Sequence, residues 1–193
     1  VEGNRIRLTV PWADSYDAKY TGEGTVVSVV NGGNRLRQCG VEYLRIESPE
    51  QAVNHTKALY YALQIKGEDC WVKDVNAVET MESVRIGGNR ITLQQVNVSR
   101  RALHQGASKP SEFSPNGGQI LLDRCSVAGD NIWFASIGAG QTGPIVFLNC
   151  TFNGNGRIEG HQRWSCGVLL DNCKLPEGGI DFKNRGSMGS GHG

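Results

Sequence analysis

LLDRCSV at 121–127 is written again, with few changes, as VFLNCTF at 146–152 and LLDNCKL at 169–175. The cysteines of these phrases, Cys125, Cys150 and Cys173, follow one another after 25 and 23 residues. A period in this range is typical of proteins built from stacked repeats. Weaker copies of the phrase come earlier in the chain, as VEYLRI around Leu44, VKDVNAV around Val75 and LQQVNV around Val96. The sequence therefore contains six copies of one unit.

Aligned on the cysteine position, the copies share four apolar columns. These columns lie five and three residues before the cysteine position, at that position itself, and two residues after it. The residue between the last two columns is polar in every copy: Arg45, Asn76, Asn97, Ser126, Thr151 and Lys174. Such alternation is typical of a half-buried β-strand.

The alternation skips one residue just before the cysteine position. A continuous strand cannot skip a residue without exchanging its two faces, so a bend is expected there. The bend position is occupied by Tyr43, Asp74, Gln95, Arg124, Asn149 and Asn172. Asparagine tolerates the left-handed backbone conformation that a tight bend requires. Each copy thus predicts two short strands around a corner, with further strands expected at 83–86 and 131–137.

Coils of this kind, stacked at about 4.8 Å, form an all-β parallel β-helix. We expect a solenoid of about six coils at 41–193, continuous with a first coil or capping segment at 1–40. A β-sandwich is the alternative, and it would leave the agreement of six copies at four columns to coincidence. Neither end carries an amphipathic cap over the open coils, which predicts that the chain is part of a longer protein.

Charge and composition limit the possible partners. A formal net charge of +1 provides no electrostatic basis for binding nucleic acid. No stretch approaches the roughly 20 apolar residues of a membrane span. The repeat columns direct five of the six cysteines inward, Cys39 and Cys70 in one column and Cys125, Cys150 and Cys173 in another, so free core thiols are expected rather than disulfides. No metal-ligand spacing is present, and we predict no cofactor; Ca²⁺ remains possible, without a ligand set.

Three longer segments interrupt the repeats at the same phase, at 47–69, 99–119 and 153–167. Insertions at one phase of a solenoid emerge on one side, and sites are commonly built on such loops. His161 is the strongest candidate, because EGHQRW at 159–164 combines an acid, an imidazole, a guanidinium and an indole. His104 is a second candidate, whereas His55 fits a solvated group. Trp12, Trp71 and Trp133 are interpreted as packing residues, and Asp123 and Asp171 as surface residues two coils apart.

The stretches GGQILLDRC, TGPIVFLNCTFNGNGRIEGHQRWSCGVLLDNC and NRGSMGSGHG resemble bacterial right-handed parallel β-helix proteins of the pectate-lyase-like superfamily, in a branch with H-x-R-W-x-x-G and G-S-G-H-G phrases. This resemblance implies a carbohydrate-active protein that is secreted, periplasmic or on the cell surface. The superfamily hosts lyases, hydrolases, epimerases and adhesins, so the likeness indicates fold more than chemistry. The aspartate cluster and the W-x-D-H phrase of pectate lyases are not found here.

The first functional hypothesis is a polysaccharide lyase that cleaves an acidic glycan by β-elimination. His161 would be the base, Arg163 would neutralise the developing charge, and His104 would be a second proton-transfer group. Substrate-binding candidates are Trp164, Arg100, Arg101, Lys109, Arg157, Arg185 and His192. The alternative is a non-catalytic glycan-binding or adhesion solenoid. A glycoside hydrolase is the third option, and it lacks a convincing carboxylate pair in the sequence.

Overall fold

The structure is a computed structural model, and it describes residues 5–8, 17–22, 26, 35–50, 61–103, 109–141, 143–161 and 165–182. The chain divides into two compact units, residues 1–34 and 35–193. In the first unit, helix α1 (Ala18–Thr21) follows Asp17, whose carboxylate accepts a hydrogen bond of 2.8 Å from the backbone N–H of Lys19. No helix among the described residues is long and apolar enough to cross a membrane.

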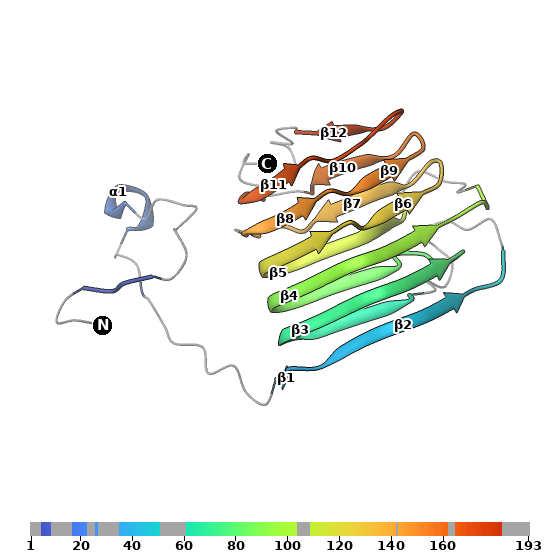
Figure 1. Ribbon diagram of the computed structural model, residues 1–193. Helices are drawn as coiled ribbons and strands as arrows, with labels where there is room; N and C mark the ends of the chain where they lie inside the picture. Colours follow the sequence, from blue (N-terminus) through green and yellow to red (C-terminus); the bar gives the residue numbers. More distant parts are fainter. Residues whose placement is uncertain are drawn as a thin grey trace. The chain divides into compact units, whose positions relative to one another are not determined.

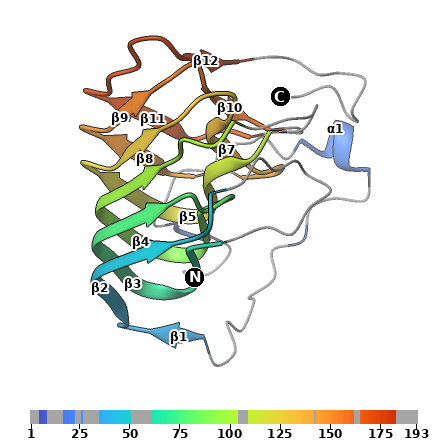
Figure 2. The same cartoon turned by 90° about the vertical axis from the view of Figure 1, so that its right-hand side faces the viewer.

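The second unit is an all-β solenoid in which every strand pair is parallel, as the sequence predicts (Figure 1). One face consists of two sides that meet at a corner. On the first side β8 (Ile145–Leu148) pairs with β11 (Val168–Asp171), on the second β6 (Ser126–Ala128) pairs with β9 (Thr151–Asn153), and β2 (Gly40–Glu47) runs across both. The other face contains β1 (Leu36–Arg37), β7 (Trp133–Ile137), β10 (Arg157–Gly160) and β12 (Gly179–Asp181). The long strands β3 (Leu63–Val78), β4 (Val84–Ser99) and β5 (Ser111–Asp123) curve around the stack between the faces (Figure 2).

The six copies of the phrase pair with one another in chain order. Leu44 pairs with Val75 and Val75 with Val96. In the column one residue after the cysteine position, Asn97 pairs with Ser126, Ser126 with Thr151, and Thr151 with Lys174. Cys125, Cys150 and Cys173 therefore occupy one column at successive turns. The solenoid has about four turns, slightly fewer than the six coils expected.

The predicted corner is present in every copy. The residue before the cysteine position has a left-handed backbone with φ of 50–55° at Tyr43, Asp74, Gln95, Arg124, Asn149 and Asn172. A second left-handed corner, which the sequence did not predict, lies six residues before the cysteine position. Its residues are Gln38, Asp69, Arg90, Gln119 and Gly167. Because a left-handed residue reverses which side its neighbours face, each corner turns the chain onto the next side of the coil.

The thiols explain why cysteine suits the first corner. Cys150 Sγ donates to the carbonyl oxygen of Leu122 in the preceding coil at 3.4 Å, and Cys173 Sγ donates to that of Phe147 at the same distance. Cys125 Sγ contacts the Leu93 oxygen in the same way at 3.6 Å. The bend interrupts the ladder of backbone hydrogen bonds, and the thiol supplies a weak donor to a buried carbonyl there while remaining small and apolar.

All six cysteines are free, as predicted. Cys70, Cys125 and Cys150 are buried, whereas Cys39 is exposed. The prediction that Cys39 packs inside is therefore wrong. Cys39 lies beside β2 in the first coil, where no preceding described coil covers it.

The apolar columns build one continuous core along the axis. Its largest buried side chains are Phe113, Phe134, Phe147 and Phe152. The rings of Phe134 and Phe152 lie 5.4 Å apart, a tilted contact across the interior. The predicted strands at 83–86 and 131–137 are largely confirmed as the start of β4 and as β7. Part of each expected insertion is also regular strand: Leu63 to Asp69 in β3, Ser111 to Gln119 in β5, and β10.

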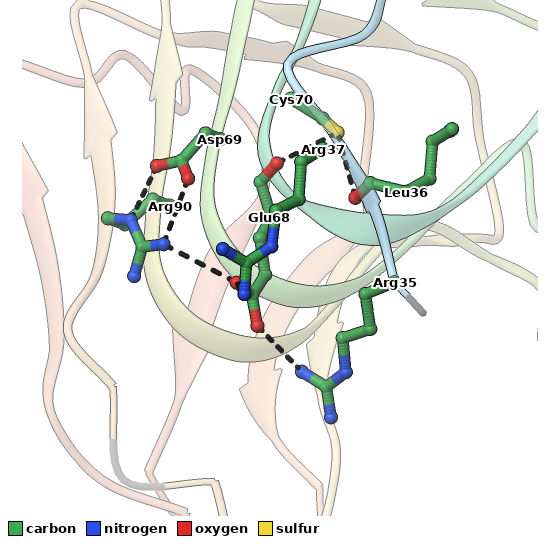
Figure 3. A network of polar contacts seen from close by, with 7 residues as sticks. All are labelled: Arg35, Leu36, Arg37, Glu68, Asp69, Cys70 and Arg90. Atoms are coloured by element: carbon green, nitrogen blue, oxygen red, sulfur yellow. Dashed lines mark hydrogen bonds and ion pairs between the residues drawn. The ribbon is translucent and has the colours of Figure 1, made fainter. Parts of the chain in front are cut away.

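Charged side chains join the first three coils at the second corner (Figure 3). Glu68 lies within 2.8 Å of Arg37 and 3.6 Å of both Arg35 and Arg90. Arg90 also holds Asp69 through two hydrogen bonds of 2.5 and 2.9 Å, and this pairing lowers the pKa of Asp69. The carboxylate of Glu68, nearly buried, thus connects β1, β3 and β4.

Candidate functional site

A polar cleft of about 410 Å³ lies on the outside of the second face, across β4, β5, β7 and β10. Its walls combine charged, hydroxyl and amide groups with one indole. The lining residues are Glu82, Arg85, Lys109, Ser111, Ser114, Asn116, Trp133, Ser136, Gly138, Glu159 and His161. The strands place these groups together because parallel strands in register stack equivalent residues in columns.

Two outward columns form the floor of the cleft. In the first column, Arg85 pairs with Ser114, and Ser136 pairs with Glu159. The second column includes Asn116, Gly138 and His161, two residues further along each strand. Between these columns the inward residues Ile86 and Ile137 belong to the core. The alternation that builds the core thus also lines the cleft.

His161 and Glu159 form the most specific constellation in the cleft. His161 Nδ1 lies 2.5 Å from Glu159 Oε1. The Glu159 side chain is 3% exposed and that of His161 is 41% exposed. A carboxylate that accepts the Nδ1 proton fixes the imidazole so that Nε2 carries the lone pair, and Nε2 is then a proton acceptor. A positioned base of this kind is the central element of general base catalysis.

The pair has a simple local origin. RIEGH at 157–161 alternates, so Glu159 and His161 extend from the same face of β10 while Ile158 enters the core. The sequence therefore contained a signal for the role of Glu159. The sequence prediction uses this acid only as a neighbour of His161 and does not assign it as the group that orients the ring.

Cationic groups line the same cleft. Lys109 is exposed at the segment before β5. Arg85 Nη1 donates to the hydroxyl of Tyr61 at 3.1 Å, and the guanidinium carbon lies 5.0 Å from the centre of that ring. Arg85 Nε is 3.7 Å from Glu82. The stacking on Tyr61 holds the guanidinium in place, so Arg85 presents an oriented cation to the cleft.

A buried polar cluster includes Ser83 and Glu112, the chain neighbours of the cleft residues Glu82 and Ser111. Glu112, fully buried, accepts hydrogen bonds from the Ser83 hydroxyl and from the Ser83 backbone N–H. The Ser83 hydroxyl also contacts Thr80 Oγ1 at 2.6 Å, and Arg100 Nη1 donates to the Thr80 carbonyl oxygen at 3.0 Å. Burial raises the pKa of Glu112 to about 7, although the hydrogen bonds of Ser83 and the charge of Arg100 oppose the rise.

The structure brings only some of the predicted site residues together. His161 and Lys109 line the cleft. Arg100 is buried in the cluster with Thr80 and is not among the residues that line the cleft. Arg101 lies 3.2 Å from Glu50 and 3.6 Å from Glu79, and Arg157 Nη1 donates to the carbonyl oxygen of Gly156 at 3.1 Å. The remaining candidates lie outside the described residues: His104, Arg163, Trp164, Arg185 and His192.

Sequence reasoning assigned no role in the site to several groups in the cleft. Arg85 and Ser136 lie on strands expected at 83–86 and 131–137, whereas Ser114 and Asn116 lie in the segment 99–119, which was interpreted as an insertion. Trp133, interpreted as a packing residue, is half-buried and lines the cleft. An indole beside hydroxyl and amide groups provides a flat apolar surface within an otherwise polar cleft.

Two pairs of acidic residues lie in columns of the sheet, one pair two strands apart and the other on neighbouring strands. Asp123 and Asp171 are separated by Leu148 in register, two strand steps apart as predicted. Glu159 and Asp181 are direct register partners on β10 and β12. Arg157 Nε is 3.9 Å from Asp181. Within the described ranges, no group of three or more histidine, cysteine or acidic side chains is placed to hold a metal ion.

Comparison with known proteins finds no match to this chain among protein-family models, curated proteins or solved structures.

Proposed function

We propose that this β-solenoid is a carbohydrate-active protein that binds an acidic polysaccharide in the polar cleft and cleaves it by β-elimination. The observation that carries the proposal is the contact of 2.5 Å between His161 Nδ1 and the buried carboxylate of Glu159. In the proposed step, Nε2 of His161 removes the proton next to the uronate carboxyl group. The electron pair of the broken C–H bond forms a double bond, and the glycosidic oxygen leaves with the electrons of its own bond and takes a proton from water.

The cations of the cleft support this chemistry. β-Elimination builds negative charge on the uronate carboxyl group, and a fixed cation stabilises that charge more than it stabilises the ground state. Lys109 and Arg85 are the described cationic groups that line the cleft with His161. Arg163 remains a candidate for neutralising this charge, His104 for a second proton transfer and Trp164 for stacking on a sugar ring. Trp133 offers an apolar surface for a sugar ring.

The test is incubation of the protein with a panel of uronic-acid polysaccharides, followed by the ultraviolet absorbance of the unsaturated uronide. We expect absorbance to rise with wild-type protein and to be abolished in His161→Ala. Glu159→Gln should reduce the rate by about a hundredfold or more, because the ring loses its orienting charge. Lys73→Ala, on the other face of the same solenoid, serves as the matched control and should cleave normally. Circular dichroism establishes that each variant is folded.

A glycoside hydrolase is the second candidate, favoured by the register pairing of Glu159 with Asp181. Neighbouring parallel strands are about 4.8 Å apart, close to the carboxylate separation of about 5 Å in retaining hydrolases. Such an enzyme would release reducing ends without any unsaturated product. Binding of a polymer without release of either product would instead indicate a glycan-binding or adhesion solenoid.

A further inference from the structure

A second hollow continues the polar cleft along the solenoid axis toward β3. It has a volume of about 250 Å³ and shares Arg85 and Asn116 with the cleft. Its other polar side chains are Gln64 and Lys66, both exposed on the first part of β3. The two hollows therefore form one groove on the outer surface of the sheet.

The floor of this groove follows one outward column of residues. Lys66 pairs with Gly87, and Gly87 pairs with Asn116. The backbone N–H of Gly138 donates to Asn116 Oδ1 at 2.9 Å, and that of His161 donates to the Ile137 carbonyl oxygen at 2.7 Å. Lys66 and His161 thus stand four strand steps apart, or about 19 Å.

Glycine at alternate positions of the column keeps the groove open. A Cβ on Gly138 would lie 2.1 Å from Asn116 Oδ1. A Cβ on Gly87 would meet nothing closer than 3.6 Å, so the depression there is unfilled space beside Lys66. The column therefore has a basic end at Lys66, a ridge at Asn116 and a proton acceptor at His161.

The two charged side chains that line the second hollow are both cationic. Lys66 and Arg85 line it, and no carboxylate does so among the described residues. Gln64 and Asn116 add side-chain amides. A site with two cations and amide donors matches a carboxylate or sulfate group in charge and in hydrogen-bonding capacity. In contrast, the cleft near His161 contains acids as well as bases.

We propose that the hollow between Lys66 and Arg85 binds a second anionic group of the same polysaccharide chain. A linear polymer would then lie along the solenoid axis, with one charged unit at His161 and another about 19 Å away. This inference rests on the proposed function for its polymer. It adds that the protein acts on internal stretches of a chain carrying repeated negative charge, and that affinity depends on chain length.

The experiment measures binding by calorimetry in the His161→Ala background, so that no probe is consumed. The probes are a galacturonate dimer, a longer oligogalacturonate that spans the groove, and a sulfated oligosaccharide without uronic acid. We expect Lys66→Ala to weaken binding of the longer oligogalacturonate about tenfold and to leave the dimer unaffected, because one charge-assisted hydrogen bond is lost. The matched control is Lys73→Ala, which removes the same charge from the same strand on the opposite face.

Each outcome has a distinct meaning. Equal effects of Lys66→Ala and Lys73→Ala on the longer oligomer would overturn the second site, even if wild-type protein releases unsaturated product. A Lys66-dependent affinity without any cleavage by wild-type protein would retain the second site and refute the lyase mechanism. Lys66-dependent binding of the sulfated probe alone would assign the anionic group as sulfate. Absence of binding by every probe would refute both proposals.

Discussion

The buried carboxyl group of Glu112 should make the stability of the solenoid fall as pH rises toward neutrality. Its pKa is about 7 in the folded protein, against 4.5 for an ordinary glutamate. The folded state therefore keeps a proton that the unfolded chain loses between these two values. Stability from this proton is fully present below pH 4.5 and is lost as pH rises through about 7. At 1.36 kcal/mol for each pKa unit, the loss amounts to about 3 kcal/mol.

The substitution Glu112→Gln tests this reasoning, since the amide has the shape of the protonated acid and cannot ionise. Urea denaturation at a series of pH values gives the free energy of unfolding of both proteins. We expect Glu112→Gln to gain about 3 kcal/mol relative to wild type between pH 4.5 and pH 8, with the change centred between 4.5 and 7. Glu47→Gln, an exposed glutamate near Arg45, is the control and should show no such change. A difference that is constant with pH, or that falls as pH rises, would refute the burial of an ionisable Glu112.

Two further predictions concern the solenoid itself. Gly88→Ala should destabilise the fold by about 3 kcal/mol, because the new Cβ would lie 2.0 Å from the Gly67 carbonyl oxygen at a backbone φ of 106°. Gly140 has a φ of 70° and open space around it, so Gly140→Ala should cost only about 1 kcal/mol in the same urea denaturation assay. Cys150→Ala should lower the melting temperature, because it removes buried volume and the thiol donor to Leu122, with a cost of about 2 kcal/mol. Cys39→Ala, at an exposed thiol, should leave it nearly unchanged, and similar melting temperatures for the two cysteine variants would contradict the buried role of Cys150.

The face of the solenoid that contains β2, β6, β8, β9 and β11 could be predicted because the same apolar pattern repeats in all six copies. One skipped residue in the alternation located the corner in all six copies, even where the corner residue is Tyr43 or Arg124, types that rarely adopt a left-handed backbone. The second corner was not predicted because the aligned apolar columns begin five residues before the cysteine position, directly after this corner. No column before the corner shows a break in the alternation. Gln38, Arg90 and Gln119 give no local indication of a bend, and their conformation is set by pairing with the neighbouring coils.

The candidate site was predicted only in part, because it depends on the register of the second face. His161 and Lys109 were recognised from their residue types, and the contact between Glu159 and His161 follows from strand alternation. The position of Arg85 in the same cleft depends on the number of residues in each coil, which varies along the chain. Arg100 is buried, and its charge lowers the pKa of buried Glu112, a long-range interaction that no local pattern indicates.

The most direct test of the account is a crystal structure of the His161→Ala variant with a bound oligogalacturonate. We predict density for the sugar chain on the outer surface of β4, β5, β7 and β10, with a uronate carboxylate within hydrogen-bond distance of Lys109 or Arg85. Density on the opposite face, over Lys73 and Asp123, would contradict the assignment of the polar cleft as the substrate site.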